Sequence, residues 1–174
     1  MNGHRVAALG ILLIFAGCGQ TTVAVAPQPK EPNSHAIGHY CRMTLTEHVG
    51  PKGQILLKGW EEPLWFTSVH DAFTYLAEDL VNEHEMAGFW VNDMGKGSWE
   101  KPAPGSWIDA KGAFYVIESK KSAEMGGSEA VPFKERERAE AFAREFGGHI
   151  VDYRTALALV GEAPARTPRE GGTQ

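Results

Sequence analysis

Two sulfur-bearing side chains, Cys41 and Met43, stand one residue apart near the start of the part of the chain that is expected to fold. In an extended strand, residues two apart project from the same face, with Cα atoms about 6.5–7 Å apart. The thiolate and the thioether could then converge on one ion, with Arg42 facing away. Both are soft ligands that favour copper(I) over magnesium, manganese or calcium, whereas zinc prefers cysteine and histidine in sets of four. The spacing therefore indicates a copper(I) site with few ligands.

A third sulfur ligand is available at Met125. The glycines that follow it, Gly126 and Gly127, permit a tight turn, and Met125 stands outside any apolar stripe, so packing explains it poorly. His39, two residues before Cys41, would share the face of that cysteine in the same strand and is a possible additional ligand. Other methionines and histidines are expected to be packing or polar surface residues: Met86, Met94, His48, His70, His84 and His149.

The first 17 residues have the layout of a signal peptide, with a positively charged start and the apolar stretch Val6–Phe15. That stretch is too short to cross about 30 Å of hydrocarbon as a permanent helix. The sequence Phe-Ala-Gly-Cys ending at Cys18 resembles the bacterial lipobox, with Phe15 in the place usually held by leucine. We expect cleavage before Cys18 and a lipid anchor on it, with plain secretory cleavage at the same place as the alternative. Gly19, rather than aspartate, indicates sorting to the outer membrane.

Lipidation of Cys18 would leave Cys41 as the only thiol in an oxidising compartment, with no partner for an intramolecular disulfide. Metal binding would displace the thiol proton and protect the sulfur from oxidation. Three other interpretations stay open. Cys41 could be a quiet structural residue, a crosslink to another chain, or the nucleophile of an enzyme with His39 or His70 as the base.

Composition and charge exclude several classes of function. The chain has 174 residues, 43% hydrophobic and 22% charged, which suits one globular domain or two very small ones sharing a core. A formal net charge of −5 offers no basic surface for nucleic acid. We find no phosphate-binding glycine loop, paired-carboxylate motif or serine-type triad, so a hydrolase or nucleotide-binding role has no support.

Proline and polar residues in 18–38 predict a flexible, lipid-anchored linker, and residues 161–174 predict a disordered tail. The folded part is expected to begin near His39. The expected strands are 54–58, 63–66, 87–94 and 149–152, with a hairpin formed by 107–110 and 113–118 around Lys111-Gly112. The expected helices are one from Thr67 or Ser68 to Leu76, one over 135–146 ended by Gly147-Gly148, and one or two turns over 155–160.

A weak internal repeat appears when Phe66 is aligned with Phe133. Each half then reads strand, strand, helix, strand, although chance similarity of helix patterns is an alternative explanation. We therefore predict an α+β fold of two small similar ββαβ-type units, over 39–100 with the Cys-x-Met motif and over 101–160 with the Met-Gly loop. The matched helix positions are Ala72 with Ala139 and Tyr75 with Phe142.

Six short motifs follow one another along residues 39–155, which is nearly all of the expected folded part. They are Cys41-Arg42-Met43, Gly50–Ile55 (GPKGQI), Trp65-Phe66, Val91–Gly95 (VNDMG), Trp107–Ala110 (WIDA) and Met125–Phe133 (MGGSEAVPF). In this order, and together with the lipobox, they resemble the NosL family of periplasmic copper lipoproteins, which is associated with nitrous oxide reductase. The ordered set is much more specific than any single motif.

The resemblance implies a pair of ββαβ-type units and a copper(I) site made of Cys41, Met43 and Met125. It implies a copper chaperone rather than an enzyme, delivering copper for the copper–sulfide centre of nitrous oxide reductase. Its implied partners are a membrane ABC-type complex of the maturation system and, directly or indirectly, the reductase. The lipid on Cys18 would hold the protein at the periplasmic face of the outer membrane. Few ligands on a mobile arm would let an incoming donor attack the ion without breaking a cage.

Overall fold

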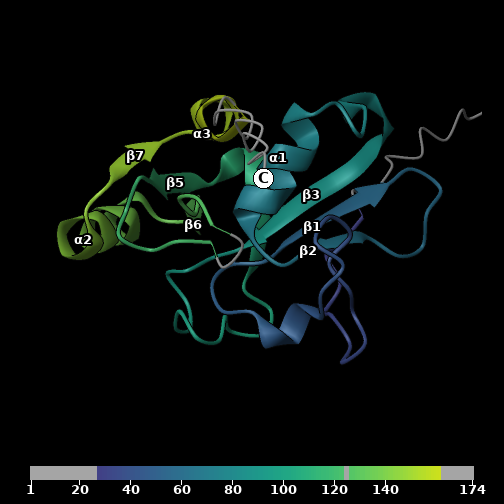
Figure 1. Ribbon diagram of the computed structural model, residues 1–174, viewed down its shortest axis with the longest axis horizontal. Coiled ribbons are helices and arrows are strands. Elements are labelled where there is room, and N and C mark those ends of the chain that lie inside the picture. Colours follow the sequence, from purple (N-terminus) through teal and green to yellow (C-terminus); the bar gives the residue numbers. More distant parts are fainter. Residues whose placement is uncertain (1–26, 124–125, 162–174) are drawn as a thin grey trace, which may run out of the picture.

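A computed structural model describes residues 27–123 and 126–161 as two small sheets with three α-helices (Figure 1). Within these residues, no helix is both long enough and apolar enough to cross a membrane. The predicted signal peptide, the lipidation site Cys18, the ligand Met125 and the predicted tail from 162 onward lie outside the described residues.

The first sheet contains four antiparallel strands in the order β2-β1-β3-β4. The 3₁₀ turns of the described chain are Leu45–Glu47, Glu83–Glu85 and Ala110–Gly112. The strands of this sheet are β1 (Gly53–Leu57), β2 (Leu64–Phe66), β3 (Met86–Asn92) and β4 (Trp107–Asp109).

Helix α1 (Val69–Ala77) follows β2 directly, and its start has a clear local cause. Ser68 is the N-cap, as the sequence predicts, and its hydroxyl accepts a hydrogen bond from the backbone N–H of Asp71 at 2.9 Å. The apolar face of the helix packs into the core through Val69, Ala72, Phe73 and Leu76. The cap and the buried face together fix where the first turn of α1 lies.

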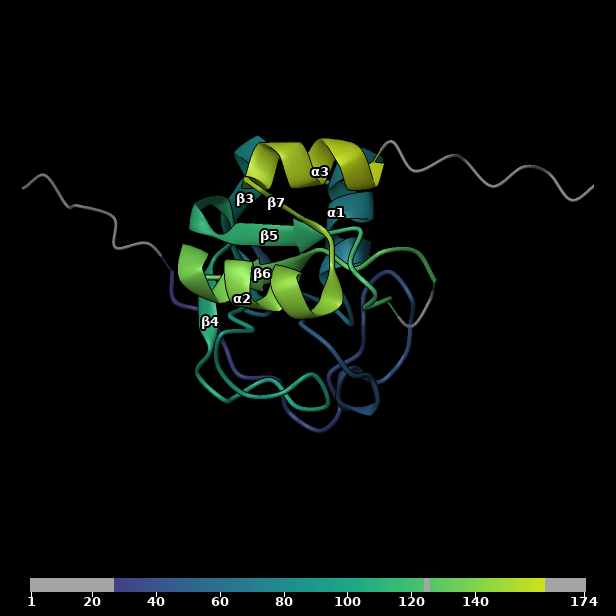
Figure 2. The ribbon, with the colours of Figure 1, turned by 90° about the vertical axis from the view of Figure 1, so that its left-hand side faces the viewer.

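The second sheet has three strands in the order β6-β5-β7, with α2 (Arg136–Phe146) packed on it (Figure 2). Helix α2 ends where Gly147 takes a φ of 76°, a left-handed conformation that glycine adopts without strain. The strands are β5 (Phe114–Ile117), β6 (Val131–Phe133) and β7 (His149–Val151).

The two ββαβ-type units of the predicted α+β fold are present: β1-β2-α1-β3 and β5-β6-α2-β7. Phe66 and Phe133 end corresponding strands, and Ala72 and Ala139 are fully buried at corresponding helix positions. The internal repeat seen in the sequence therefore has a structural counterpart. Figure 1 shows the second unit beside the first, with α3 above their junction.

The predicted hairpin around Lys111-Gly112 is wrong. Strand β4 pairs with β3 in the first sheet, and β5 belongs to the second sheet. The residues between them form a 3₁₀ turn in which the Asp109 carboxylate accepts a hydrogen bond from the Lys111 N–H at 3.1 Å. This turn carries the chain from one sheet to the other, so the first unit extends beyond residue 100 to include β4.

The two units share a core. Helix α3 (Tyr153–Gly161), which is longer than the one or two turns expected over 155–160, packs against α1 of the first unit. The largest apolar cluster contains Phe73 of α1 and Tyr115 of β5, whose rings lie 5.2 Å apart, together with Tyr153. The chain therefore folds as one body built from two similar halves.

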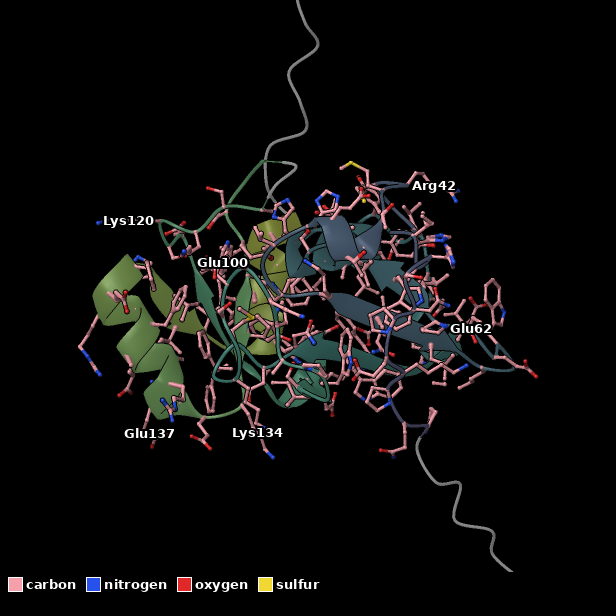
Figure 3. The ribbon with its side chains drawn as sticks, turned by 90° about the horizontal axis from the view of Figure 1, so that it is seen from below. Arg42, Glu62, Glu100, Lys120, Lys134 and Glu137 are labelled. Atoms are coloured by element: carbon pink, nitrogen blue, oxygen red, sulfur yellow. The ribbon has the colours of Figure 1, made fainter. Side chains whose placement is uncertain are left out.

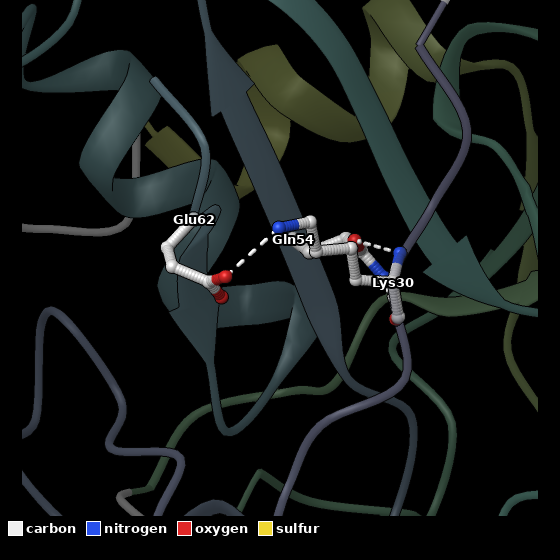
Figure 4. A network of polar contacts seen from close by, with 3 residues as sticks. All are labelled: Lys30, Gln54 and Glu62. Carbon is white, nitrogen blue, oxygen red and sulfur yellow. Dashed lines mark hydrogen bonds and ion pairs between the residues drawn. The ribbon is translucent and has the colours of Figure 1, made fainter.

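The boundary of the predicted linker at residue 38 needs correction, because residues 30–38 contact the folded part. The backbone N–H and C=O of Lys30 both bond the buried amide of Gln54 on β1, at 2.9 Å each, and Lys30 Nζ pairs with Glu62 at 2.8 Å (Figure 4). Ala36 is buried beside Leu45. Pro32 has no backbone N–H to donate, but the backbone of Lys30 satisfies a buried side chain of the sheet.

Candidate metal centre

Cys41 and Met43 lie in a tight turn, so the extended strand expected for them is wrong. Arg42 has a φ of 63°, which is left-handed. The turn is closed by two backbone hydrogen bonds, from the Gly38 N–H to the Met43 C=O at 2.8 Å and from the Arg42 N–H to the Gly38 C=O at 2.9 Å. The alternation of a strand therefore does not orient the two sulfur side chains, and the turn presents them instead.

The thiol of Cys41 is free and half-buried. Its Sγ lies 3.1 Å from the Oγ1 of Thr67, the residue between β2 and the cap of α1. On the other side is the backbone of Gly38, where a Cβ would lie 2.7 Å from the sulfur. The sulfur therefore occupies a slot between the backbone of Gly38, which has no side chain, and the side chain of Thr67.

The two residues that follow Cys41 in the turn differ in exposure. Arg42 is exposed, and Figure 3 shows it at the edge of the molecule, on the side away from Glu137 of α2. Met43 is half-buried and belongs to none of the apolar clusters formed by the described residues. By contrast Met86 and Met94 pack against such clusters, which confirms their predicted packing role. The thioether of Met43 is thus not part of these clusters and would be available to a soft metal ion.

His39 contacts aromatic rings. Its Nε2 lies 3.3 Å from the hydroxyl of Tyr75, and its ring meets those of Tyr75 and Phe66 edge-on. Burial lowers the pKa of His39 below its usual value, and the nearby positive charge of Arg42 lowers it further. A lowered pKa keeps the imidazole neutral, the form that binds metals, although its Nε2 already has a partner in Tyr75.

The described residues that flank the Met-Gly loop contact one another. Ser122 and Ser128 form an antiparallel bridge, the Ala123 N–H donates to the Gly127 C=O at 3.2 Å, and the Glu129 N–H donates to Lys121 at 3.3 Å. The side chain of Lys121 lies over the aromatic rings of Trp99 and Phe146, at 4.9 and 4.8 Å from their centroids. The base on both sides of Met125 is therefore well fixed.

His70, on the first turn of α1, holds this loop, a contact that the sequence did not reveal. Its Nδ1 lies 3.0 Å from the carbonyl oxygen of Ser128. A carbonyl only accepts, so Nδ1 is the donor; in a neutral ring the lone pair would then lie on the other nitrogen, Nε2. Gly127, at a φ of 86°, passes so close to the ring that a Cβ there would lie 2.9 Å from it. Gly127, the second glycine after Met125, is thus needed for the close approach of the backbone to the His70 ring.

Glu129 joins the same loop to the same helix from inside the protein. Its carboxylate is fully buried and accepts hydrogen bonds from the N–H of His70 at 2.8 Å and of Ala130 at 3.0 Å. The pKa of Glu129 is raised to about 8, mainly by burial and to a smaller extent by the negative charge of Asp71, against the opposing effect of the two N–H donors and Lys52. The Glu129 side chain is therefore largely protonated at neutral pH.

Both candidate ligand loops therefore meet at the beginning of α1. Thr67, just before the helix, contacts Cys41, and His70, three residues later, contacts the base of the Met-Gly loop. The described residues contain no cluster of three histidine, cysteine or carboxylate side chains that could hold a metal ion.

The region around Cys41 is an open turn. Two hollows of about 890 and 530 Å³ lie elsewhere, the first lined by residues of α1 and α3 and the second by residues near Trp107, and neither is lined by Cys41. The hydrogen-bond partner of the thiol is Thr67 rather than a histidine base.

Comparison with known proteins gives a consistent result. A family model described as NosL matches residues 29–156. A protein of Achromobacter cycloclastes named copper-binding lipoprotein NosL is 39% identical over 165 residues, covering 94% of this chain and 82% of that protein. A protein of the same name from Stutzerimonas stutzeri is 33% identical over 156 residues, covering 86% of this chain and 80% of that one.

The fold is also similar to a solved structure, the crystal structure of the copper chaperone NosL from Shewanella denitrificans. The TM-score is 0.68 at 31% identity, and the match covers 73% of this chain and 93% of the other. The match of the family model begins at residue 29, close to the point where the chain first contacts the sheet.

Proposed function

This chain belongs to the NosL family, and from that membership we propose that it binds one copper(I) ion outside the cytoplasm and passes it to a partner protein. The relatives named copper-binding lipoproteins align with 94% and 86% of this chain, so the proposal concerns the chain as a whole. The proposed ligands are Cys41, Met43 and Met125.

One observation supports this proposal most strongly. A free, half-buried thiol lies at the N-terminal end of α1, and the base of the Met-Gly loop contacts the same end of this helix. Two segments more than 80 residues apart in sequence are thereby brought to one place. A thiolate with two thioethers is a soft set that suits copper(I) with two or three ligands. His70, through its Nε2, and His39 are the nearby imidazoles that could complete the set.

The partial exposure of Cys41 and Met43 supports transfer of the ion rather than its storage. An ion with few ligands on an exposed turn can be attacked by a donor from another protein before its first bonds break. We propose that the recipient is the maturation system of nitrous oxide reductase, reached through a membrane ABC-type complex, where copper serves the copper–sulfide centre. A lipid on Cys18 would hold the chain at the periplasmic face of the outer membrane.

The test is an anaerobic copper(I) titration of the full chain in detergent, in competition with a chromophoric chelator. We expect one tightly bound ion per chain. Cys41→Ser should abolish tight binding, because it removes the proposed thiolate ligand, whereas Met43→Leu and Met125→Leu should each weaken it in part. Met94→Leu, which changes a packed methionine outside the site, is the matched control and should bind as the parent does. Unchanged binding by Cys41→Ser would exclude the proposed site.

The rival functions make different predictions. A disulfide-crosslinking lipoprotein would run as a larger species on non-reducing gels, and Cys41→Ser would remove that species. A thiol-dependent enzyme would turn over a substrate without metal. The hydrogen bond of Cys41 to a hydroxyl, with no histidine base in that place, does not favour the second rival.

A further inference from the structure

We propose that Thr67, held by Asp71, is a positioning residue for the Cys41 sulfur, as its hydrogen-bond acceptor before copper arrives and its donor afterwards. This inference rests on the proposed function, since it assumes that copper(I) binds Cys41. It assigns to the segment before α1 a role that neither the Cys-x-Met motif nor the Met-Gly loop supplies.

The slot between Gly38 and Thr67 restricts the position of the Cys41 sulfur. Gly38 and Thr67 face each other across it: a Cβ on Gly38 would lie 2.7 Å from Cys41 Sγ and 3.0 Å from the Thr67 methyl group. Sγ is 3.1 Å from Thr67 Oγ1, and Thr67 is only 3% exposed. The hydroxyl therefore meets the sulfur from inside the protein and leaves its outer side open to the ion.

The hydroxyl is itself held by a buried carboxylate. Thr67 Oγ1 donates to Asp71 Oδ2 at 3.2 Å, and Asp71 is 3% exposed in the first turn of α1. The backbone N–H of Asp71 is bound by the cap residue Ser68, so the carboxylate belongs to a rigid helix start. The order of contacts from the helix outward is carboxylate, hydroxyl, sulfur.

A hydroxyl has one hydrogen, and this fixes the direction of each contact. Because Thr67 donates its hydrogen to Asp71, it must accept from the S–H of Cys41 in the copper-free protein. When the copper–sulfur bond forms, the S–H bond breaks and the proton leaves to solvent, so the sulfur can only accept. The Thr67 hydrogen then turns from Asp71 to the sulfur. Asp71 keeps the favourable potential of the helix N-terminus after it loses this donor.

The test compares three variants of the full chain: Thr67→Val, Thr67→Ser and Thr74→Val. Valine has the shape of threonine without the hydroxyl, serine keeps the hydroxyl, and Thr74 is a half-buried threonine later on α1. Thr67→Val removes the donor to the sulfur in the loaded protein and the donor to Asp71 in the copper-free protein. Because the two losses partly cancel, copper(I) binding should weaken about three- to tenfold. Thr67→Ser and Thr74→Val should stay close to the parent.

A second measurement separates this role from packing. The near-ultraviolet sulfur-to-copper absorption of the loaded protein should move to lower energy in Thr67→Val, because the sulfur lone pairs lose a donor, and should return in Thr67→Ser. Thermal unfolding of the copper-free variants reports any loss of folding.

Three outcomes overturn the inference. They are parent-like binding by Thr67→Val, failure of Thr67→Ser to restore binding, and an unchanged absorption band. If Cys41→Ser abolishes binding while Thr67→Val does not weaken it, the positioning role fails and the proposed function stands. If Cys41→Ser binds as the parent does, the proposed site itself fails.

Discussion

At the scale of single residues, the position of the Cys41 sulfur depends on the lack of a side chain at Gly38. Gly38 is buried, its backbone closes the turn through hydrogen bonds to Met43 and Arg42, and its missing Cβ leaves the room that the sulfur fills. The glycine is needed here for close approach, and its φ lies outside the left-handed region.

Gly38→Ala should therefore displace the sulfur. A Cβ at 2.7 Å from Sγ cannot be accommodated without movement, and overpacking of this kind costs about 1–3 kcal/mol of stability. We expect a lower unfolding midpoint for the copper-free protein and weaker copper(I) binding in the chelator assay. Gly112→Ala is the control, because a Cβ at Gly112 meets no atom within 4 Å. Equal binding by both variants would show that the slot does not position the sulfur.

The sequence suggests ligands for this site but does not give the backbone geometry that holds them. A lone exported thiol next to a thioether indicates copper(I) from ligand softness alone, because that argument needs no coordinates. The left-handed conformation of Arg42 could not be foreseen, since arginine has no preference for it. His70 was missed for a different reason: its partner, Ser128, lies 58 residues away, and only the folded chain brings them together.

At the scale of elements, the start of α1 in the first unit contacts the segment before β6 in the second unit, next to the candidate metal centre. Glu129, just before β6, sends its carboxylate to the N–H of His70 on α1. The side chain is completely buried next to Asp71, so it is more stable with its proton than without it. This makes the junction sensitive to pH.

Glu129→Gln should remove a decline in stability that the parent shows as the pH rises. The carboxyl has a pKa of about 8 when folded and 4.5 when exposed, so between these values the unfolded chain releases the proton and the folded chain keeps it. This group then lowers the free energy of unfolding by about 1.4 kcal/mol per pH unit in that window, with no further loss above it. We expect the stability of the variant relative to the parent to grow from pH 5 to pH 8 in urea unfolding.

The comparison with Glu145→Gln isolates the effect of burial. Glu145 is an exposed carboxylate on α2, so its removal tests what loss of a surface charge does to the same titration. A stability difference for Glu129→Gln that did not change with pH would mean that the folded protein accommodates the charged carboxylate.

Most helices and strands follow from local pattern, and their connections follow from longer contacts. The cap at Ser68 and the apolar face behind it predicted α1 to within a residue. Lys111-Gly112 resembled a two-residue hairpin turn, but the Asp109 side chain closes a 3₁₀ turn there and β4 pairs with β3 instead. Residues 30–38 looked like free linker because their bonding partner, Gln54, is remote in sequence.

At the scale of the whole molecule, the aromatic cluster around α3 makes two repeats into one folding unit. The ring of Tyr153 lies 5.7 Å from that of Phe73 on α1 and 6.2 Å from that of Phe89 on β3. Its hydroxyl is buried and, within the described residues, makes no hydrogen bond. Helix α3 is thus held against the first unit by the ring of Tyr153, while the hydroxyl of the same side chain has no hydrogen-bond partner among the described residues.

Tyr153→Phe should stabilise the protein by about 1–3 kcal/mol, because it removes a buried hydroxyl that has lost its hydrogen bonds to water. Tyr153→Ala should destabilise it by about 3–5 kcal/mol, through loss of the ring contacts and the cavity left behind. Thermal unfolding is followed by tryptophan fluorescence, since all five tryptophans lie between residues 60 and 107, and by far-ultraviolet circular dichroism, which reports on both units. With a shared core, the two signals should change together in every variant. A Tyr153→Ala transition that came earlier by circular dichroism than by fluorescence would show that the halves unfold separately, and a less stable Tyr153→Phe would show that the hydroxyl has a partner.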